Sequence, residues 1–417
     1  MSMDPNVKKI LIISVLILIL MRILLLFLIP YLPHLEQYKI SNLPPTAGQF
    51  KYGDHFLAIQ EGDDLNYYAM ASRIYNLDFK ESFSRGLAFP LMIVLFIFIF
   101  GNSFAGIFLP VVIFNGIFLF CGAIALIVWA AFFIFSVQNT GNSKIPGGKK
   151  IFPAVLSGFL FLIFPFIFYV LRNYGPQFKT GAWNDINFLN MNWLSVMTDP
   201  PAAFFTLLIL FLLLIAEKRK SRPLFYSLIG FLVGFSMMIR ITNIVIAVAA
   251  ILVIFLFETE KRYKKIFFYC LSSLIAFMPQ FVYNAVFFGS PLSFGYAQEY
   301  LTAWVTRKGS IMWNPGYFSH LIGRAVDYSV LVIPALTIVL SLLLLGIFYI
   351  ARTSKRHAFM MALWFFFPVL IYMFFAAGQT AIRYYMPAVP ALIILSVAAL
   401  CAIFDWFKIK FSFYKID

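Results

Sequence analysis

Residues 104–136 read FAGIFLPVVIFNGIFLFCGAIALIVWAAFFIFS, and none of these residues is charged. About 20 consecutive apolar residues suffice to cross the hydrocarbon core of a bilayer, so this run is predicted to be a membrane-spanning helix. The rest of the chain has the same character. Of its 417 residues, 62% are hydrophobic and 12% are charged, and the mean hydropathy is +0.89. No soluble globular domain has this balance, so the solvent of the protein is the bilayer.

Nine other apolar runs meet the same test, which predicts an all-α polytopic protein of about ten transmembrane helices. The ten runs are 10–31, 104–136, 151–171, 200–216, 223–239, 241–257, 266–288, 328–350, 358–377 and 387–405. One further run, 87–100 (LAFPLMIVLFIFIF), is too short for a comfortable crossing. Such runs are often re-entrant or interfacial, and we expect this one to enter the membrane and return on the same side.

The charge distribution predicts the orientation. The net charge of +15 resides mostly in short connections between apolar runs, such as EKRKSR (217–222), EKRYKK (260–265) and RTSKR (352–356), which argues against nucleic-acid binding. With a cytoplasmic N-terminus and a non-crossing 87–100, nearly all basic clusters lie inside, as the positive-inside rule requires. The long loops 32–103, 172–199 and 289–327 then lie outside. We therefore expect a multi-pass plasma-membrane protein that works at its outer face.

The sequence offers little support for disulfides or metal ligands. The three cysteines lie in or beside apolar runs, and the four histidines show no ligand spacing, so no metal site is predicted. A divalent cation held by Asp63, Asp64 and His55 remains open.

The stretch EGDDLNYYAMASRIYNLD (61–78) places two adjacent carboxylates at the start of a short aromatic helix. Its helical spacing predicts an interfacial helix with Leu65, Tyr68, Ala69 and Ser72 on its apolar face. Asp63 stands at the N-cap, where a carboxylate stabilises the helix end. One cap requires one carboxylate, and a charge pair at the membrane surface is costly without a role.

Six stretches of the chain form a recognisable series of motifs, namely GDDLNYYAMASRIY (62–75), SRGLAFPLMIVLFIFIFG (84–101), MTDPPAAFFTLL (197–208), GFLVGFSMMIRITN (230–243), YNAVFFGSPLSFGY (283–296) and AIRYYMPAVPALIIL (381–395). In these stretches the chain resembles the GT-C glycosyltransferases, in particular the family 39 type that includes protein O-mannosyltransferases and lipid A aminoarabinose transferases. The resemblance covers most of the chain and departs from the family where Arg85 stands further from Pro90 than the basic residue of the pattern does.

The resemblance implies one integral membrane domain over residues 1–417, folded as a GT-C-like bundle. From the sequence itself we expect no soluble domain. The resemblance also implies transfer of a sugar, with inversion, from a polyprenyl phosphate to a lipid, glycan or protein acceptor. Asp63 matches the catalytic acidic residue and would be the general base, with Asp64 as the alternative. No cofactor is implied besides the lipid-linked donor.

The same resemblance supplies the substrate-binding residues. Arg383 and Tyr384 match an Arg-Tyr motif, and Arg383 would hold the donor phosphate together with Arg85. Asp199 precedes two prolines, so it is either a helix cap or a residue that lines the site. Arg240 is a second phosphate candidate, and Tyr296 is a candidate for the sugar pocket.

Two other functions fit a polytopic membrane protein. A lipid or glycolipid transporter or flippase would bury ionisable groups near the membrane midplane and often show inverted repeats. A non-catalytic scaffold would not require Asp63, Arg85 and Arg383 on the same face. The acids at the outer ends of the spans and the lack of a visible repeat favour the enzyme.

Overall fold

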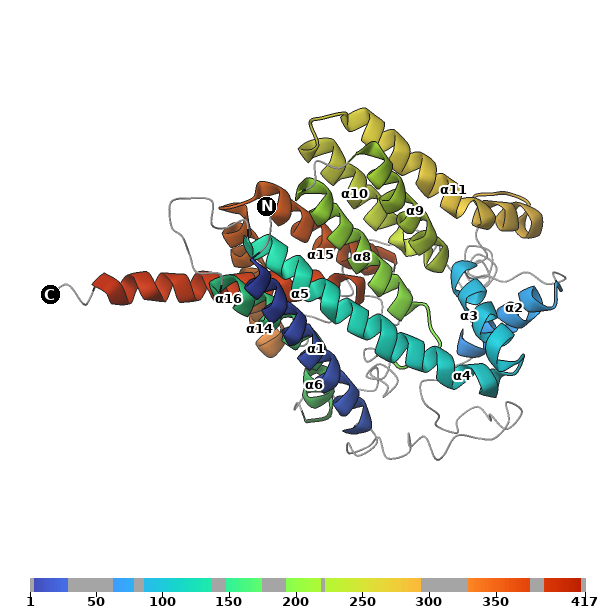
Figure 1. The fold of residues 1–417 in the computed structure, drawn as a ribbon, viewed down its shortest axis with the longest axis horizontal. Helices are drawn as coiled ribbons and strands as arrows, with labels where there is room; N and C mark the ends of the chain where they lie inside the picture. The colour runs from blue at the N-terminus through green and yellow to red at the C-terminus, as the bar shows by residue number, and fades with distance from the viewer. Residues whose placement is uncertain are drawn as a thin grey trace.

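A computed structural model describes residues 4–28, 63–78, 86–136, 148–174, 193–218, 222–293, 329–375 and 386–413. These residues form helices, and no strand occurs among them (Figure 1). The longer helices run alongside one another in a bundle, and α2 (Asp63–Tyr75) and α3 (Ala88–Phe100) lie together at one end of it. We call this end the α2–α3 end.

The described residues of each of the ten runs predicted to cross the membrane lie in helices of the bundle, and positions 29–31, 328 and 376–377 of these runs fall outside the described part of the chain. These helices are α1 (Pro5–Leu28), the continuous α4–η5–α5 (Phe104–Ile113, Phe114–Leu119, Phe120–Ser136), α6 (Gly148–Tyr174), α8 (Asp199–Lys218), α9 (Pro223–Ile239), η7–α10 (Ile241–Asn243, Ile244–Phe257), α11 (Arg262–Phe288), α14 (Ser329–Ala351), α15 (Lys355–Phe375) and α16 (Val389–Phe413). Within the described residues, six helices are long and apolar enough to cross a membrane. The chain is thus an all-α polytopic membrane protein, and the count of ten crossings stays a prediction.

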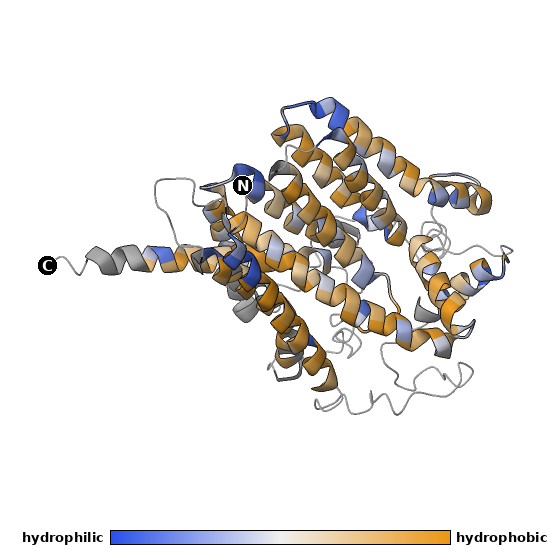
Figure 2. Ribbon diagram, in the orientation of Figure 1, coloured by the Kyte–Doolittle hydropathy of each residue, from blue (hydrophilic) through white to orange (hydrophobic). Residues whose placement is uncertain are grey.

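The surface of the bundle suits a bilayer. Hydrophobic residues cover most of the helices, and hydrophilic residues gather at helix ends such as the turn before α11 (Figure 2). Large apolar side chains such as Phe27, Phe98 and Phe118 are more than half exposed. A soluble monomer rarely exposes apolar surface on this scale, whereas lipid tails solvate it.

Helix α3 has the short length that the sequence predicts. Its 13 residues extend about 20 Å, which is less than the hydrocarbon core of a bilayer. It ends at Gly101, whose φ of 88° lies in the left-handed region that glycine tolerates, and α4 begins at Phe104. The chain therefore turns immediately after α3, and the expectation that this helix does not cross the membrane stays a prediction.

The predicted apolar face of α2 is wrong. The buried side chains are Tyr67, Met70 and Ala71, whereas Ala69 is exposed. The reason is tertiary packing: α2 lies against α3, and the ring of Tyr67 meets that of Phe89 edge-on at 5.2 Å between centroids. The helix buries the residues that face its neighbour, and the hydrophobicity of the sequence alone does not identify that side.

Candidate functional site

The segment that leads into α8 is the centre of the α2–α3 end. All residues from Trp193 to Pro200 are buried, although residues 193–198 form no regular helix. Trp193 has a φ of 64°, which is unusual for a bulky residue and requires support from its surroundings. We call residues 193–198 the α8 lead-in.

Helix α2 contacts the last residue of the lead-in. The hydroxyl groups of Tyr67 and Thr198 share a hydrogen bond with 3.4 Å between the oxygen atoms. Both side chains are buried. The next residue of α2, Tyr68, points elsewhere: its hydroxyl donates to Oδ1 of Asn102, between α3 and α4, at 3.2 Å. Two successive residues of α2 therefore contact different parts of the protein: Tyr67 contacts the lead-in, and Tyr68 contacts the turn between α3 and α4.

Asp199, the first residue of α8, forms an ion pair with Arg240. Its side chain is 2% exposed, and that of Arg240 is 14% exposed. Arg240 lies at the break between α9 and η7, so that its guanidinium reaches across to the start of α8. The structure thus brings together two residues that the sequence suggested as separate candidates. Asp199 is the first residue of α8 and is paired with Arg240, and its role at the substrate site stays a prediction.

The start of α3 lies beside the same break. Gly86 approaches the carbonyl group of Met238 so closely that a Cβ would lie 2.0 Å from that oxygen. Glycine is therefore required at position 86. Its contact, Met238, lies two residues before Arg240 in the chain, and Gly86 itself follows position 85. The backbone N–H of Leu87 donates to Oε1 of Gln280 in α11 at 2.9 Å. The start of α3 is thus fixed to α9 and α11.

A buried amide relay continues from Gln280. Its Nε2 donates to Oδ1 of Asn284 at 2.9 Å, and Nδ2 of Asn284 donates to the carbonyl oxygen of Pro291 at 3.0 Å. The relay links the start of α3 to the turn after α11. Gln280 was not predicted as a site residue, although a polar residue in an apolar helix is a signal that could have identified it.

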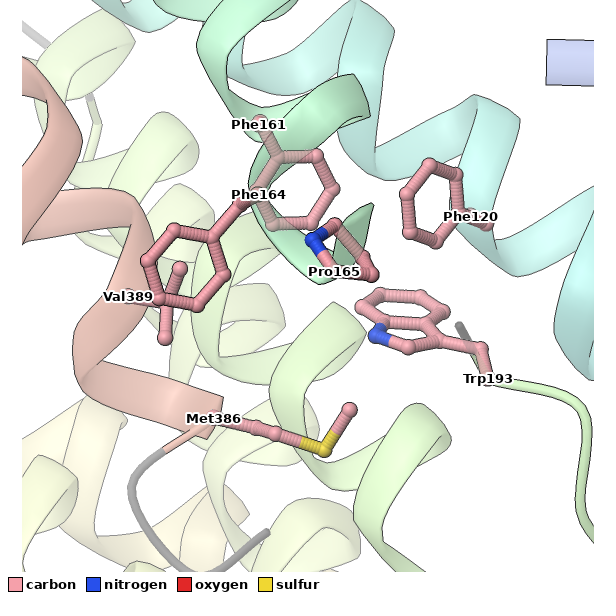
Figure 3. A pocket seen from close by; sticks show the side chains of 7 residues that line it. All are labelled: Phe120, Phe161, Phe164, Pro165, Trp193, Met386 and Val389. Carbon is pink, nitrogen blue, oxygen red and sulfur yellow. The ribbon is translucent and has the colours of Figure 1, made fainter. Parts of the chain in front are cut away.

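An apolar pocket lies beside the α8 lead-in (Figure 3). Trp193 and Met386 form part of its wall, and the remaining lining residues are Phe120, Phe161, Phe164, Pro165 and Val389. Met386 precedes α16 and follows position 383 by three residues, a reach of at most about 11 Å. The pocket connects the lead-in to the start of the last helix.

Several predicted site residues lie outside the described residues, namely Arg85, Tyr296, Arg383 and Tyr384, and so do the side chains of Asp63 and Asp64. Among the described residues, no group of three or more His, Cys, Asp or Glu side chains could hold a metal ion. What the described residues bring together is the start of α3, the start of α8, the end of α9 and helix α2.

The comparisons with known proteins concern the fold. No family model and no curated protein matches the sequence. The archaeal oligosaccharyltransferase AglB from Archaeoglobus fulgidus, in complex with an inhibitory peptide and a dolichol-phosphate, matches 99% of this chain with a TM-score of 0.51 and 13% identity.

Two crystal structures of the Archaeoglobus fulgidus oligosaccharyltransferase also match. The complex with zinc and sulfate covers 84% of this chain (TM-score 0.48, 16% identity), and the enzyme tethered to an acceptor peptide covers 97% (TM-score 0.45, 14% identity). This chain spans about half the length of each neighbour, between 46% and 52%. At 13% identity, the match to AglB shows a similar fold over about half of that protein.

Proposed function

We propose that the protein is a membrane glycosyltransferase of the GT-C type that moves a sugar from a polyprenyl phosphate to an acceptor at the outer face of the plasma membrane. The observation that carries this proposal is the contact of α2 with the α8 lead-in. One turn after residue 63, Tyr67 bonds to Thr198, and the next residue is the buried acid Asp199, paired with Arg240. The fold shared with AglB, which was solved with dolichol-phosphate, supports a lipid-linked donor.

The register of α2 favours Asp63 over Asp64 as the general base. Residues four apart on a helix lie on nearly the same face. Position 63 is thus stacked above Tyr67, which contacts the lead-in, and position 64 above Tyr68, which contacts Asn102. Position 63 therefore belongs to the face of α2 that contacts the lead-in and position 64 to the face that contacts Asn102, which supports Asp63 as the base.

In the proposed reaction, Asp63 takes the proton of the acceptor hydroxyl while the acceptor oxygen bonds to the anomeric carbon from the face opposite the phosphate. The bond between that carbon and the phosphate oxygen breaks, and the polyprenyl phosphate leaves with the electron pair. Inversion follows from this geometry. A general base contributes about 10²–10⁴-fold to such a step.

The leaving phosphate requires cations, and we assign Arg383 and Arg85 to it. Position 85 adjoins Gly86, which contacts Met238, and position 383 lies three residues from Met386, which contacts the pocket beside Trp193. Both arginines are thus tied by short stretches of chain to the surroundings of Asp199. Arg240 is already paired with Asp199, so we assign this ion pair to the wall of the sugar site, with Tyr296 as a further wall residue.

The test uses the full chain in lipid vesicles with a panel of polyprenyl-phosphate sugars and an extract of envelope acceptors. We expect radiolabelled sugar to enter the acceptor fraction with the native protein. Asp63→Asn should retain donor binding and lose about 10²–10⁴-fold in transfer rate, and Asp64→Asn is the matched control with a smaller loss.

Transfer by Asp63→Asn at the native rate would overturn the assignment of the base. Movement of the lipid-linked sugar between leaflets without transfer to any acceptor would instead indicate a flippase.

A further inference from the structure

Arg22 is a charged side chain buried inside the first helix of the bundle. Its exposed fraction is 0%, and it lies in the otherwise apolar α1. A charge inside a membrane span is costly, so a retained one calls for an identified partner. Its Nε and Nη2 both donate to the carbonyl oxygen of Gly116, at 3.1 and 3.0 Å, and its guanidinium lies 3.9 Å from the centre of the Phe120 ring.

The partner of Arg22 belongs to a π-helical turn. Gly116 lies in η5, between α4 and α5. A π-turn changes the hydrogen-bond register of a helix and is frequent at functional sites. The forked guanidinium can bond one carbonyl oxygen with two N–H groups, which a lysine cannot do. Arg22 therefore fixes the backbone at the centre of this turn.

The same π-turn holds the α8 lead-in. Asn115, the neighbour of Gly116, is fully buried, and its Nδ2 donates to the carbonyl oxygen of Ser195 at 2.7 Å. Gly116 itself lies so close to the lead-in that a Cβ would be 2.5 Å from Cδ2 of Leu194. A shift of η5 would therefore be transmitted to residues 194 and 195.

An aromatic contact provides a second connection. The Phe120 ring that faces Arg22 meets Trp193 edge-on at 5.3 Å between centroids, and both rings also contact Phe161. Trp193 is the residue with the unusual backbone conformation at the start of the lead-in. Arg22 thus reaches both ends of the stretch 193–195, through Phe120 and through η5.

We infer that Arg22 is a positioning residue: it fixes η5 and Phe120, these fix the α8 lead-in, and the lead-in sets the position of Asp199 and its partner Arg240. The consequence for sugar transfer rests on the proposed function. The structural link itself does not, because it joins two parts of the chain whatever reaction takes place between them.

The first measurement is amide hydrogen exchange of the full chain in lipid nanodiscs, read on peptides that cover residues 193–199. We expect Arg22→Met to raise exchange there by about tenfold, because the lead-in loses its support from η5. Arg22→Lys keeps the charge and one donor, so it should give an intermediate increase. If Arg22→Met fails to fold, Asn115→Leu breaks the other end of the link and should raise exchange in the same peptides.

The matched control is Arg356→Met. Arg356 is also a buried arginine, but it donates to Glu258 and to the carbonyl oxygen of Leu213. Neither of these residues belongs to the lead-in. We expect it to leave exchange at residues 193–199 unchanged. Unchanged exchange at 193–199 in both Arg22→Met and Asn115→Leu would overturn the link.

The second measurement is the transfer rate per folded molecule. Arg22→Met should lower kcat by about 10- to 100-fold, with partial recovery in Arg22→Lys, because a small displacement of site residues has effects of this size. Increased exchange with an unchanged kcat would overturn the positioning role. A native protein that transfers no sugar would overturn the proposed function, and the exchange measurement would still decide on the link.

Discussion

At the scale of single residues, the Asp199–Arg240 pair decides how the α2–α3 end is held. Both groups are largely shielded from water, so each depends on the other for compensation of its charge. The pair joins the start of α8 to the break after α9, and neighbouring residues in the chain contact Gly86 before α3 and Tyr67 in α2. Neither partner is a free ligand for a substrate as the site stands.

Replacing one partner should therefore lower the free energy of unfolding more than replacing both. We expect Asp199→Asn or Arg240→Met alone to destabilise the protein by about 3–5 kcal/mol, because a buried charge is left without its counterpart. The double variant should recover much of that loss. Denaturant unfolding in detergent measures all three, and additive losses would contradict a direct coupling.

At the scale of elements, helix α9 packs against α11 through glycines. A Cβ at Gly230 would lie 2.1 Å from the carbonyl oxygen of Tyr269, and one at Gly234 would lie 2.2 Å from that of Ser273. Small residues four apart permit this close approach of two backbones, which is a common way to pack helices in membranes. The end of α9 carries Arg240, so this contact also supports the site.

Two opposing effects determine whether Gly230→Ala stabilises or destabilises the protein. Helix propensity favours alanine over glycine by about 1 kcal/mol, whereas overpacking costs about 1–3 kcal/mol. We expect Gly230→Ala to lower the unfolding temperature, since backbone atoms must separate. Leu228→Ala, at an exposed position of the same helix, serves as control and should change it little. Stabilisation by Gly230→Ala would refute the close contact.

A charge cluster fixes the helix ends opposite the α2–α3 end. Glu258, at the end of α10, accepts hydrogen bonds from Lys265 in α11 at 2.5 Å and from Arg356 in α15 at 2.6 Å. Burial opposes ionisation of this carboxyl group, but the hydrogen bonds from Lys265 and Arg356 prevail and lower the pKa of Glu258 below its usual value. The cluster joins three helices through one carboxylate.

The lowered pKa predicts an acid-sensitive contribution. A carboxyl group whose pKa is lower in the folded state stabilises the fold above the unfolded pKa of about 4.5, and this contribution disappears as the pH falls through the folded value. We expect Glu258→Gln to be less stable than the native protein at pH 7, with a difference that shrinks on acidification. Thermal unfolding from pH 7 to pH 3 measures it. Glu260→Gln, at an exposed glutamate two residues away, should show no such trend.

At the scale of the whole molecule, successive helices run in alternating directions, so the helix ends that carry the candidate site meet at the same end of the bundle. Helix α8 begins, α9 ends and α11 ends where α2 and α3 lie, whereas Glu258 and Arg356 mark the opposite end. If the positive-inside rule holds, the basic turns near Glu258 are cytoplasmic and the α2–α3 end faces outward.

The orientation can be tested with single cysteines. In a chain whose native cysteines at 121, 270 and 401 are replaced by alanine, we expect Ser143→Cys to react with an impermeant maleimide only after the cells are permeabilised. Ser41→Cys, in the predicted first outer loop, should react in intact cells and is the control. Labelling of position 143 from outside would reverse the topology.

The sequence by itself determined the class of the protein and the places of its helices. Run length and composition are local properties, and a bilayer admits few structures besides apolar helices, so the described residues of the ten predicted runs and of the short helix α3 are found as helices. The sequence also predicts Asp63, Asp199 and Arg240 as site residues, because charged residues at the ends of apolar runs are rare and costly.

Only the tertiary structure decided which of these residues meet. The buried face of α2, the pairing of Asp199 with Arg240 and the contact of Arg22 with Gly116 each join segments far apart in the chain. In an apolar sequence almost every face of a helix could be buried, because the lipid and the core favour the same side chains. The choice depends on which helices pack together, and the hydrophobic pattern of a membrane protein does not encode that choice locally.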